Sequence, residues 1–244
     1  MRDNVFTFLV GGEAGFGVKK AGAVAASLFS SMGRRVFVMD DYGSLIRGGH
    51  NFSVVSTSAV EITSHYRRPN LALCLDGRSV DKHRDYLRED GLLIYDSDKS
   101  ELESGVGIPL STLASEYERP DLMLGVGAVA ALASATGLSR KEMESLIRQN
   151  YPGDNRENLD YAGKIYRELQ DKVNGRFELS RGDTDLPVIY GNEAIALGGA
   201  AGGLDIYISY PMTPASTILH FLAKYSEKLG VTVFHPGSEI AAIN

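Results

Sequence analysis

Two short segments of the sequence carry residue types that suit anion binding and proton transfer. Thr213 stands between Pro211 and Pro214, directly after a short apolar run. Proline disfavours helix at the residue before it and suits the first turn of a new helix. Thr213 is therefore expected where a strand ends and a helix begins, and the free N–H groups of such a helix favour an anion.

Glu239 follows the next apolar run along the chain and supports two interpretations. A carboxylate held behind a strand can take part in general acid–base chemistry. An acid directly after Ser238 also suits the first turn of a helix, where the helix dipole stabilises negative charge. Residue types alone favour the second, structural interpretation.

The elements that hold these residues are predicted to alternate between helix and strand. The pattern indicates, in order, a helix of small residues that Asn192 could cap, a strand at 205–209, an amphipathic helix at 214–229, a strand at 231–235 and a final helix capped by Ser238. This region is short for an independent core of its class. The sequence therefore predicts the incomplete start of an α/β domain at residues 190–244.

A second candidate site is a glycine-rich turn near the start of the chain. A strand at 4–10 is followed by Gly12, Gly15 and Gly17, and then by a helix at 18–32. Backbone N–H groups at such a turn can point at a phosphate. No dinucleotide fingerprint fits the register, and Val18 stands where a P-loop requires lysine. Phosphate contact and a tight structural turn both remain open.

The strand after this helix, at 35–39, ends at Asp40, where a dinucleotide-binding domain would contact a ribose. A flexible R-G-G loop follows at 47–49, which is not a dehydrogenase feature. Further strands are predicted at 51–58, 71–75, 91–95 and 106–110, and helices at 77–88, 121–136, 139–149 and 155–172. The helix at 121–136 should be buried, with Gly125 and Gly127 allowing close packing, and Ser139 and Glu142 predict a capping box at the start of the helix that follows. We expect a complete α/β domain with a mostly parallel sheet at 1–172, followed by a linker at 173–189.

Composition is that of a globular protein and excludes several classes. Of 244 residues, 43% are hydrophobic and 23% charged, and the net charge of −6 argues against nucleic-acid binding. No apolar run is long enough for a signal peptide or a membrane span. The single cysteine, Cys74, is expected to be buried, and without a disulfide framework we predict a cytoplasmic protein. Neither an iron–sulfur cluster nor a metal site is expected on this chain.

Both candidate sites carry motifs that resemble one enzyme family. The segments G-N-E-A-I-A-L-G-G-A-A-G, Y-P-M-T-P-A-S and S-E-I-A-A-I resemble the opening of the pyrimidine-binding domain of 2-oxoacid:ferredoxin oxidoreductases. These are thiamine diphosphate enzymes of the pyruvate and 2-oxoglutarate synthase kind. The family form is close to Y-P-I-T-P-S-S, so Met212 and Ala215 are small departures. The glycine-rich turn and the later R-G-G resemble the family's gamma-type domain, although Glu13 and Ala14 stand where that turn usually has Gly and Gln.

The resemblance implies roles for four residues of the second region. Glu239 would be the glutamate that holds the far pyrimidine nitrogen of thiamine and favours the tautomer that takes the C2 proton. It should then be buried. Thr213 would donate a hydrogen bond to the 2-oxoacid or contact the cofactor, while Tyr210 and Pro211 would shape the pocket. The alternative is that the two prolines only form a rigid turn.

For the first region the resemblance implies an association with coenzyme A. Gly12, Gly15, Gly17 and Arg47 would be the candidates for contact with its phosphates. A solvated or intersubunit Arg47 is the alternative.

The whole resemblance implies an alpha subunit with a gamma-type domain fused in front. Its reaction would be the oxidative decarboxylation of a 2-oxoacid with coenzyme A, giving acyl-CoA, CO₂ and reduced ferredoxin. Thiamine diphosphate would be shared with a thiamine-binding beta subunit that carries the Mg²⁺ and an iron–sulfur cluster, and the chain by itself should be inactive. Two alternatives remain: a nucleotide-binding α/β protein based on the glycine turn and Asp40, and a non-catalytic assembly module that holds partner subunits.

Overall fold

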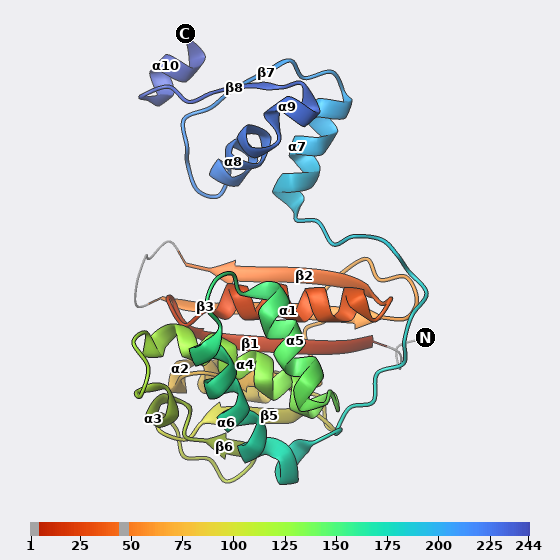
Figure 1. Cartoon of the computed structure of the whole chain (residues 1–244), viewed down its shortest axis with the longest axis vertical. Coiled ribbons are helices and arrows are strands. Elements are labelled where there is room, and N and C mark those ends of the chain that lie inside the picture. The colour runs from red at the N-terminus through yellow and green to blue at the C-terminus, as the bar shows by residue number, and fades with distance from the viewer. Residues whose placement is uncertain (1–4, 44–48) are drawn as a thin grey trace. The chain divides into compact units, whose positions relative to one another are not determined.

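The computed structural model describes residues 5–43 and 49–244 of the chain. The chain divides into two compact units, Met1–Leu186 and Pro187–Asn244, each with its own β-sheet (Figure 1). Arg47, a candidate for phosphate contact, lies outside the described residues. No helix in the described part of the chain is long and apolar enough to cross a lipid bilayer.

The first unit is built on a six-stranded sheet. Its strands are β1 (Val5–Glu13), β2 (Arg35–Tyr42), β3 (His50–Ser58), β4 (Leu71–Cys74), β5 (Leu92–Asp96) and β6 (Val106–Ile108). Their order across the sheet is β2-β3-β1-β4-β5-β6. Of these six strands, β3 is antiparallel to its neighbours and the other pairs are parallel, which confirms the predicted mostly parallel α/β fold.

The first elements form the predicted strand–helix–strand unit with one difference. Helix α1 (Val18–Ser31) connects β1 to β2, and these strands point the same way because each is antiparallel to β3. β3 lies between them. In a dinucleotide-binding fold the two strands are adjacent, so the acid ending the second one lies near the glycine turn. Asp40 is separated from that turn by β3, which argues against the NAD interpretation.

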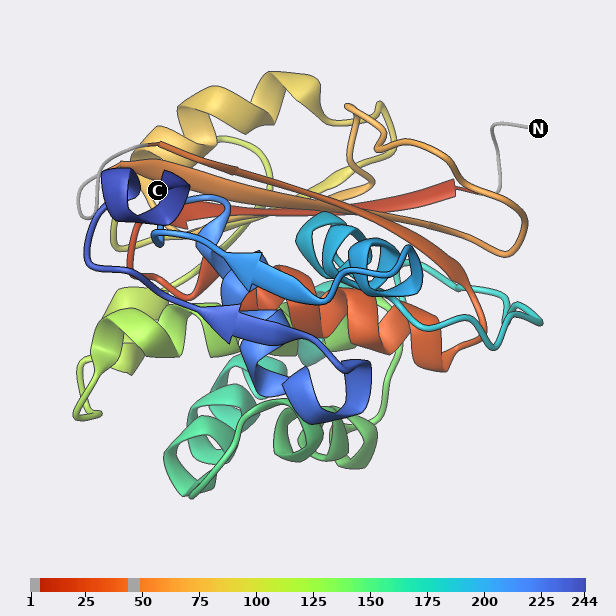
Figure 2. The same cartoon turned by 90° about the horizontal axis from the view of Figure 1, so that it is seen from above.

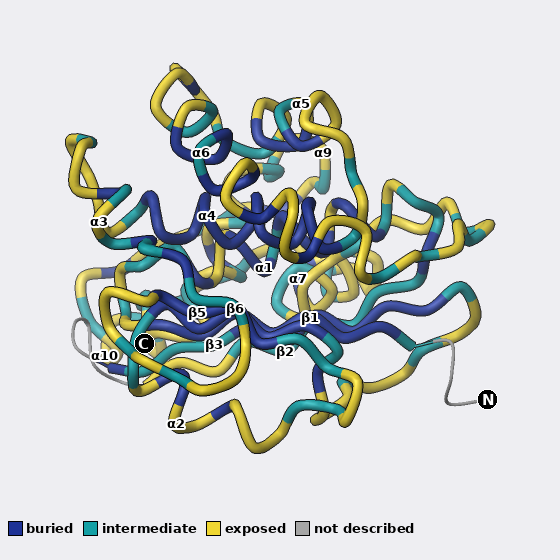
Figure 3. The backbone as a smooth tube through the Cα atoms, turned by 90° about the horizontal axis from the view of Figure 1, so that it is seen from below, coloured by how far each residue is buried: buried dark blue, intermediate teal, exposed yellow. Residues whose placement is uncertain are grey.

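Helices cover both faces of the six-stranded sheet (Figure 3). They are α1, α2 (Gly77–His83), the 3₁₀ turn η1 (Arg84–Tyr86), α3 (Leu110–Ala114), α4 (Pro120–Ala135), α5 (Arg140–Asn150) and α6 (Arg156–Val173). Successive strand residues point to opposite faces. The ring of Phe6 lies 5.8 Å from that of Phe29 in α1, whereas Leu9 packs in a cluster with Val80 of α2 on the other face. Cys74 belongs to this second cluster and is fully buried, as predicted.

Helix α4 comes very close to the glycine-rich turn. Residues 123–135 of this helix are all buried. A Cβ atom on Gly125 would lie 2.9 Å from the backbone oxygen atoms of Phe16 and Gly17, which is closer than side chains approach backbone. The prediction of a buried helix with glycine allowing close packing is confirmed.

The strand β1 is longer than the sequence predicts. We expected it to end at Val10, yet it continues through Gly11 and Gly12 to Glu13, because β3 pairs with it over its whole length. The turn proper is therefore shorter and lies at 14–17.

Residues 174–190 contain neither helix nor strand, but part of this predicted linker is bound to the first unit. The guanidinium of Arg34 donates to the carbonyl of Ser180 at 2.6 Å, and the N–H of Gly182 donates to the carbonyl of Met32 at 3.0 Å. The first unit therefore extends well beyond helix α6.

The second unit contains a two-stranded parallel sheet flanked by helices. Its elements are α7 (Gly191–Ala201), β7 (Ile206–Ile208), α8 (Ser216–Lys224), α9 (Ser226–Leu229), β8 (Thr232–Phe234) and α10 (Glu239–Ile243). Figure 2 shows β7 and β8 side by side. The helix predicted at 214–229 is divided into α8 and α9 at Tyr225.

The core of the second unit is small. Its centre consists of three buried side chains, Ala196, Leu222 and Val231. On the sheet face turned away from this core, Ile206, Ile208 and Phe234 are 56%, 48% and 58% exposed. Parallel sheets are normally covered on both faces, so this face is apolar surface that the unit does not cover itself.

Candidate functional site

The candidate site of the second unit lies at one edge of its sheet. Because β7 and β8 are parallel, their C-terminal ends meet at the same edge. Residues 209–214 leave β7 there, and residues 235–239 leave β8. The ring centroids of Tyr210 and His235 are 6.2 Å apart across this edge. The structure thus brings together the two predicted segments, at the place where α/β sheets usually bind ligands.

Thr213 lies in the turn between β7 and α8 and is exposed. The N–H of Ser216, where α8 begins, donates to the carbonyl of Met212 at 2.8 Å and closes the turn. The helix thus starts two residues after Pro214. Within the described residues, the Thr213 hydroxyl makes no hydrogen bond to another side chain or backbone group. It is therefore available to a ligand.

Asn192 has a role that the sequence did not reveal. We expected it to cap α7, but the N–H of Tyr190 is instead bound by the carboxylate of Glu193, at 2.9 Å. The Asn192 side-chain amide donates to the carbonyl of Pro214 at 2.8 Å and to the hydroxyl of Thr217 at 2.5 Å. Asn192 therefore ties α7 to the turn that carries the candidate threonine. A contact across 22 residues leaves no local sequence signal.

Glu239 is the first residue of α10, and the Ser238 side chain caps this helix by accepting from the N–H of Ala241 at 3.2 Å. Glu239 follows β8 and Thr213 follows β7, on the side where both parallel strands end. Within the described residues, no hydrogen bond joins Glu239 to Thr213. The expectation that Glu239 is buried is wrong for this chain, since it is exposed. The reason is that the five residues of α10 include no buried one, so nothing described covers them.

The glycine turn combines structural constraints with one open position. Gly17 has φ of 73° and packs against Gly125, and a Cβ atom on Gly12 would lie 3.1 Å from the Leu75 side chain. Gly15, with φ of 112°, would meet nothing within 4 Å. Gly12 and Gly17 thus have packing reasons to be glycine, and Gly15 leaves backbone open to a ligand.

A histidine pair in the first unit also escaped the sequence analysis. The hydroxyl of Ser79 donates to Asp76 at 2.7 Å and so accepts from His50 Nδ1 at 3.4 Å. This leaves His50 Nε2 as the acceptor for His83 Nε2, at 2.9 Å. The chain of hydrogen bonds fixes both rings between β3 and α2.

Both imidazoles of this pair are neutral near pH 7. Burial, followed by the positive charge of Lys82, lowers the pKa of His50, and burial followed by the neighbouring His50 lowers the pKa of His83 to about 4. The His83 ring also packs edge-on against Phe52, with centroids 4.9 Å apart. The pair therefore forms a fixed, uncharged wall on one face of the sheet.

Comparison with known families finds a match in each unit. Residues 7–168 match the family described as pyruvate ferredoxin/flavodoxin oxidoreductase. Residues 198–244 match the thiamine diphosphate-binding region of pyruvate flavodoxin/ferredoxin oxidoreductase. The two matches include the glycine turn and the candidate site at the β7–β8 edge, respectively.

One curated relative matches nearly the whole chain, and another matches a short part of it. The 2-oxoacid:ferredoxin oxidoreductase 2, subunit alpha, of Aeropyrum pernix is 24% identical over 308 aligned residues, which cover 98% of this chain and 48% of that protein. Ketoisovalerate oxidoreductase subunit VorB of Methanothermobacter thermautotrophicus is 42% identical over 57 residues, covering 23% of this chain and 16% of that protein. The chain spans about half the length of the alpha-subunit relatives that it matches from end to end.

A solved structure shares the fold. The 2-oxoglutarate:ferredoxin oxidoreductase from Magnetococcus marinus, solved with 2-oxoglutarate, coenzyme A and succinyl-CoA bound, matches with a TM-score of 0.82 at 22% identity. The match covers 99% of this chain and 45% of that one. The predicted fold class, an α/β domain followed by part of a thiamine diphosphate-binding α/β domain, is thereby confirmed.

Proposed function

The chain belongs to the pyruvate ferredoxin/flavodoxin oxidoreductase family, and we propose on this premise that it works as part of a 2-oxoacid:ferredoxin oxidoreductase. The reaction would convert a 2-oxoacid and coenzyme A into acyl-CoA and CO₂, with the electrons passing to ferredoxin. The observation that carries this proposal is the order of the two matched regions in one chain, which is also the order in the alpha-subunit relative. The gamma-type domain would be 1–172 and the pyrimidine-binding region 190–244, joined by 173–189.

The site at the β7–β8 edge would hold the pyrimidine end of thiamine diphosphate. This cofactor supplies, when bound, a nucleophilic carbon and an electron sink. Glu239 would accept a hydrogen bond from the pyrimidine and so favour the tautomer that moves the proton. Thr213, with its uncommitted hydroxyl, would donate to the 2-oxoacid or the cofactor, while Tyr210 and Pro211 would form the adjoining wall. Thr213 and Glu239 are both exposed, which supports a site that is completed by another protein surface.

Further components are expected on other proteins. A thiamine-binding beta subunit would provide the Mg²⁺ site and an iron–sulfur cluster, as the family resemblance implies. Coenzyme A would meet the first unit at Gly12, Gly15 and Gly17, with Arg47 as a phosphate contact, and Gly15 is the position that the packing leaves open. We place the assembly in the cytoplasm.

The proposal is tested with Glu239→Gln in the full protein, assembled with its thiamine-binding partner. The amide keeps the size of the side chain but carries no negative charge, so it cannot favour the required pyrimidine tautomer as the carboxylate would. The rate of 2-oxoacid-dependent reduction of a redox dye should therefore fall by at least about 100-fold. Glu227→Gln is the matched control, because Glu227 is also an acid in the first turn of a helix of the second unit.

The two variants separate the catalytic from the structural interpretation of Glu239. If Glu239 serves only the helix dipole, both variants should lose a few tenths of a kcal/mol of stability and keep their turnover. Near-normal turnover of Glu239→Gln would remove this residue from the mechanism.

A further inference from the structure

A cleft of about 330 Å³ opens on the face of the six-stranded sheet opposite α1. Leu9, Met39 and Val54 form its floor from three neighbouring strands, because Val54 is in register with both Leu9 and Met39. Phe52 continues this floor along β3. The volume is at the lower end of the range for small-molecule pockets.

The wall of the cleft is preformed. His83 lines it, and this ring is fixed by its hydrogen bond to His50 and by its edge-on contact with Phe52. Met39 and Phe52 are only partly buried, although they belong to the apolar cluster under α2. A ligand with an apolar body could therefore cover them without rearranging the wall.

Among the described residues that line the cleft, two are cations and none carries a carboxylate. The two cations come from different segments: Arg67 lies in the segment before β4, and Lys82 lies in α2. The Arg67 guanidinium lies 5.7 Å from the ring centroid of Tyr86, which also lines the cleft. Within the described residues, neither Arg67 nor Lys82 takes part in an ion pair. Both cations are thus available to an anion.

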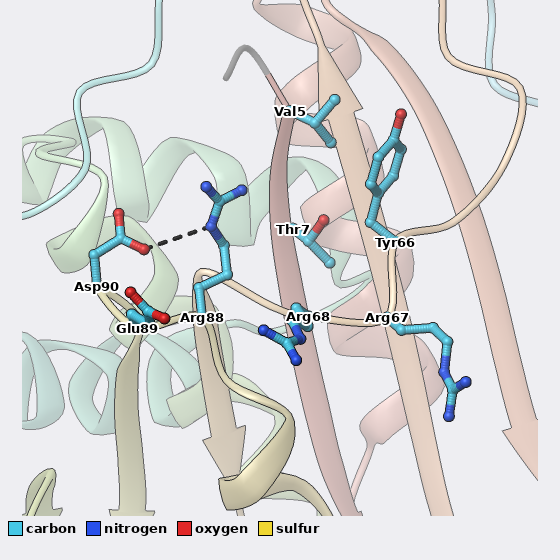
Figure 4. A pocket seen from close by; sticks show the side chains of 8 residues that line it. All are labelled: Val5, Thr7, Tyr66, Arg67, Arg68, Arg88, Glu89 and Asp90. Carbon is cyan, nitrogen blue, oxygen red and sulfur yellow. Dashed lines mark ion pairs between the residues drawn. The ribbon is translucent and has the colours of Figure 1, made fainter. Parts of the chain in front are cut away.

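A larger pocket nearby has a different charge balance (Figure 4). It measures about 720 Å³ and adjoins the cleft at Arg67, which lines both. Arg68 and Arg88 also line it, and so do the acids Glu89 and Asp90. Arg88 already pairs with Asp90 at 3.4 Å. Figure 4 shows the Arg67 side chain directed away from this pair. The smaller cleft, with an apolar floor and no acid, is therefore the better site for an anionic ligand.

We propose that this cleft binds a small organic acid, whose apolar body lies on Met39 and Phe52 and whose carboxylate contacts Arg67 and Lys82. Charge-assisted hydrogen bonds from two cations orient the carboxylate. The floor favours a compact aryl or branched aliphatic body. The residues that line the cleft belong neither to the glycine turn nor to the second unit, and binding here does not depend on the proposed oxidoreductase activity.

Calorimetric titration of the chain with 3-phenylpropionate tests the proposal. We expect saturable binding that weakens as salt is added. The uncharged analogue 3-phenyl-1-propanol should bind at least about tenfold more weakly, because it lacks the carboxylate. Acetate, which lacks the body, should show no saturable binding.

Variants locate the bound acid. Lys82→Gln and Arg67→Gln should each weaken 3-phenylpropionate binding by about tenfold. Arg88→Gln, in the larger pocket, and Arg84→Gln, an exposed arginine that pairs with Asp85, are the matched controls and should leave the affinity unchanged. Unchanged thermal unfolding of all four variants shows that the fold is kept.

Several results would overturn the proposal. The first is the absence of saturable 3-phenylpropionate binding, and the second is binding of 3-phenyl-1-propanol with equal affinity. The third is a loss of affinity for the acid in Arg88→Gln as large as that in Lys82→Gln. Displacement of the acid by coenzyme A, abolished by Lys82→Gln, would assign the cleft to that larger ligand instead. Each of these results leaves the proposed enzymatic function standing, because no turnover is measured.

Discussion

The two units of the chain differ in how much of their apolar surface they bury themselves. In the first, helices lie on both sides of the sheet, and strand residues such as Leu73 and Val55 are fully buried. In the second, Leu222 is equally buried, yet Ile208 and Phe234 on the open sheet face are about half exposed. The first unit therefore has a core of its own, whereas the second presents an apolar face of the kind that marks an interaction surface.

This difference bears directly on the chemistry. The residues proposed for thiamine chemistry, Thr213 and Glu239, lie in the unit with the smaller core, and both are exposed. An active site of this kind must exclude water to strengthen its electrostatic interactions. Under the proposed function, the second unit would supply one wall of the site, and another surface would have to complete it.

The comparison is tested most strongly by the same substitution in each core. Leu73→Ala should destabilise the first unit by about 4 kcal/mol, because tightly packed surroundings cannot collapse into the cavity. Leu222→Ala should cost less, about 2–3 kcal/mol, because its partly exposed neighbours can close around it. Native-state hydrogen exchange, followed separately for each unit, measures both losses.

The control for this pair is Ile243→Ala, since Ile243 is 86% exposed and should contribute almost nothing. Equal losses for the two leucine variants, or a larger loss for Leu222→Ala, would break the distinction between the units.

The next effect is a pH dependence confined to the first unit. Burial lowers the pKa of His83 to about 4 from an ordinary value of 6.5, so between these values the unfolded chain binds more protons than the folded one. Stability should therefore be complete above pH 6.5 and fall by about 2 kcal/mol as the pH drops toward 4, after allowing for screening by water. Urea unfolding at several pH values measures this loss.

His83→Leu should flatten that dependence, and the His83 ring protons should titrate near pH 4 in NMR spectra. An NMR midpoint near 6.5 would show that the ring is not held in the neutral hydrogen-bonded pair.

The smallest effect concerns the turn in the second unit. Asn192→Asp replaces the donating amide by a carboxylate that cannot donate to the Pro214 carbonyl, so the turn should lose about 1 kcal/mol of local stability. Faster hydrogen exchange at Ser216 would report it. Asn158→Asp, on helix α6 of the first unit, is the control and should leave that exchange rate unchanged.

Much of the fold could be predicted because its signals are local. The capping box that joins Ser139 and Glu142 spans three residues, and the structure contains it as predicted. The continuous small and apolar residues of α4 indicate a buried helix without any knowledge of its neighbours. The family resemblance, drawn from motifs around Thr213 and Glu239, is likewise confirmed by the match of residues 7–168 and 198–244.

The parts that could not be predicted depend on contacts between distant residues. Asn192 looks like a helix cap in the sequence, and only the fold brings it to the Pro214 carbonyl. The hydrogen bond between His50 and His83 joins two unremarkable positions 33 residues apart. The exposure of Glu239 depends on which surfaces surround α10, and local patterns carry no information about them.

The close approach of the segment after α6 to the end of α1 has a practical consequence for anyone who separates the two halves of this protein. A side chain at Gly182 would collide with the Gly33 carbonyl, and the N–H of Thr184 donates to the same carbonyl at 3.0 Å. If the gene is divided directly after α6, the first half loses the segment at 182–184 that is hydrogen-bonded to the end of α1. The boundary belongs after Thr184, and limited proteolysis should find its first cut there.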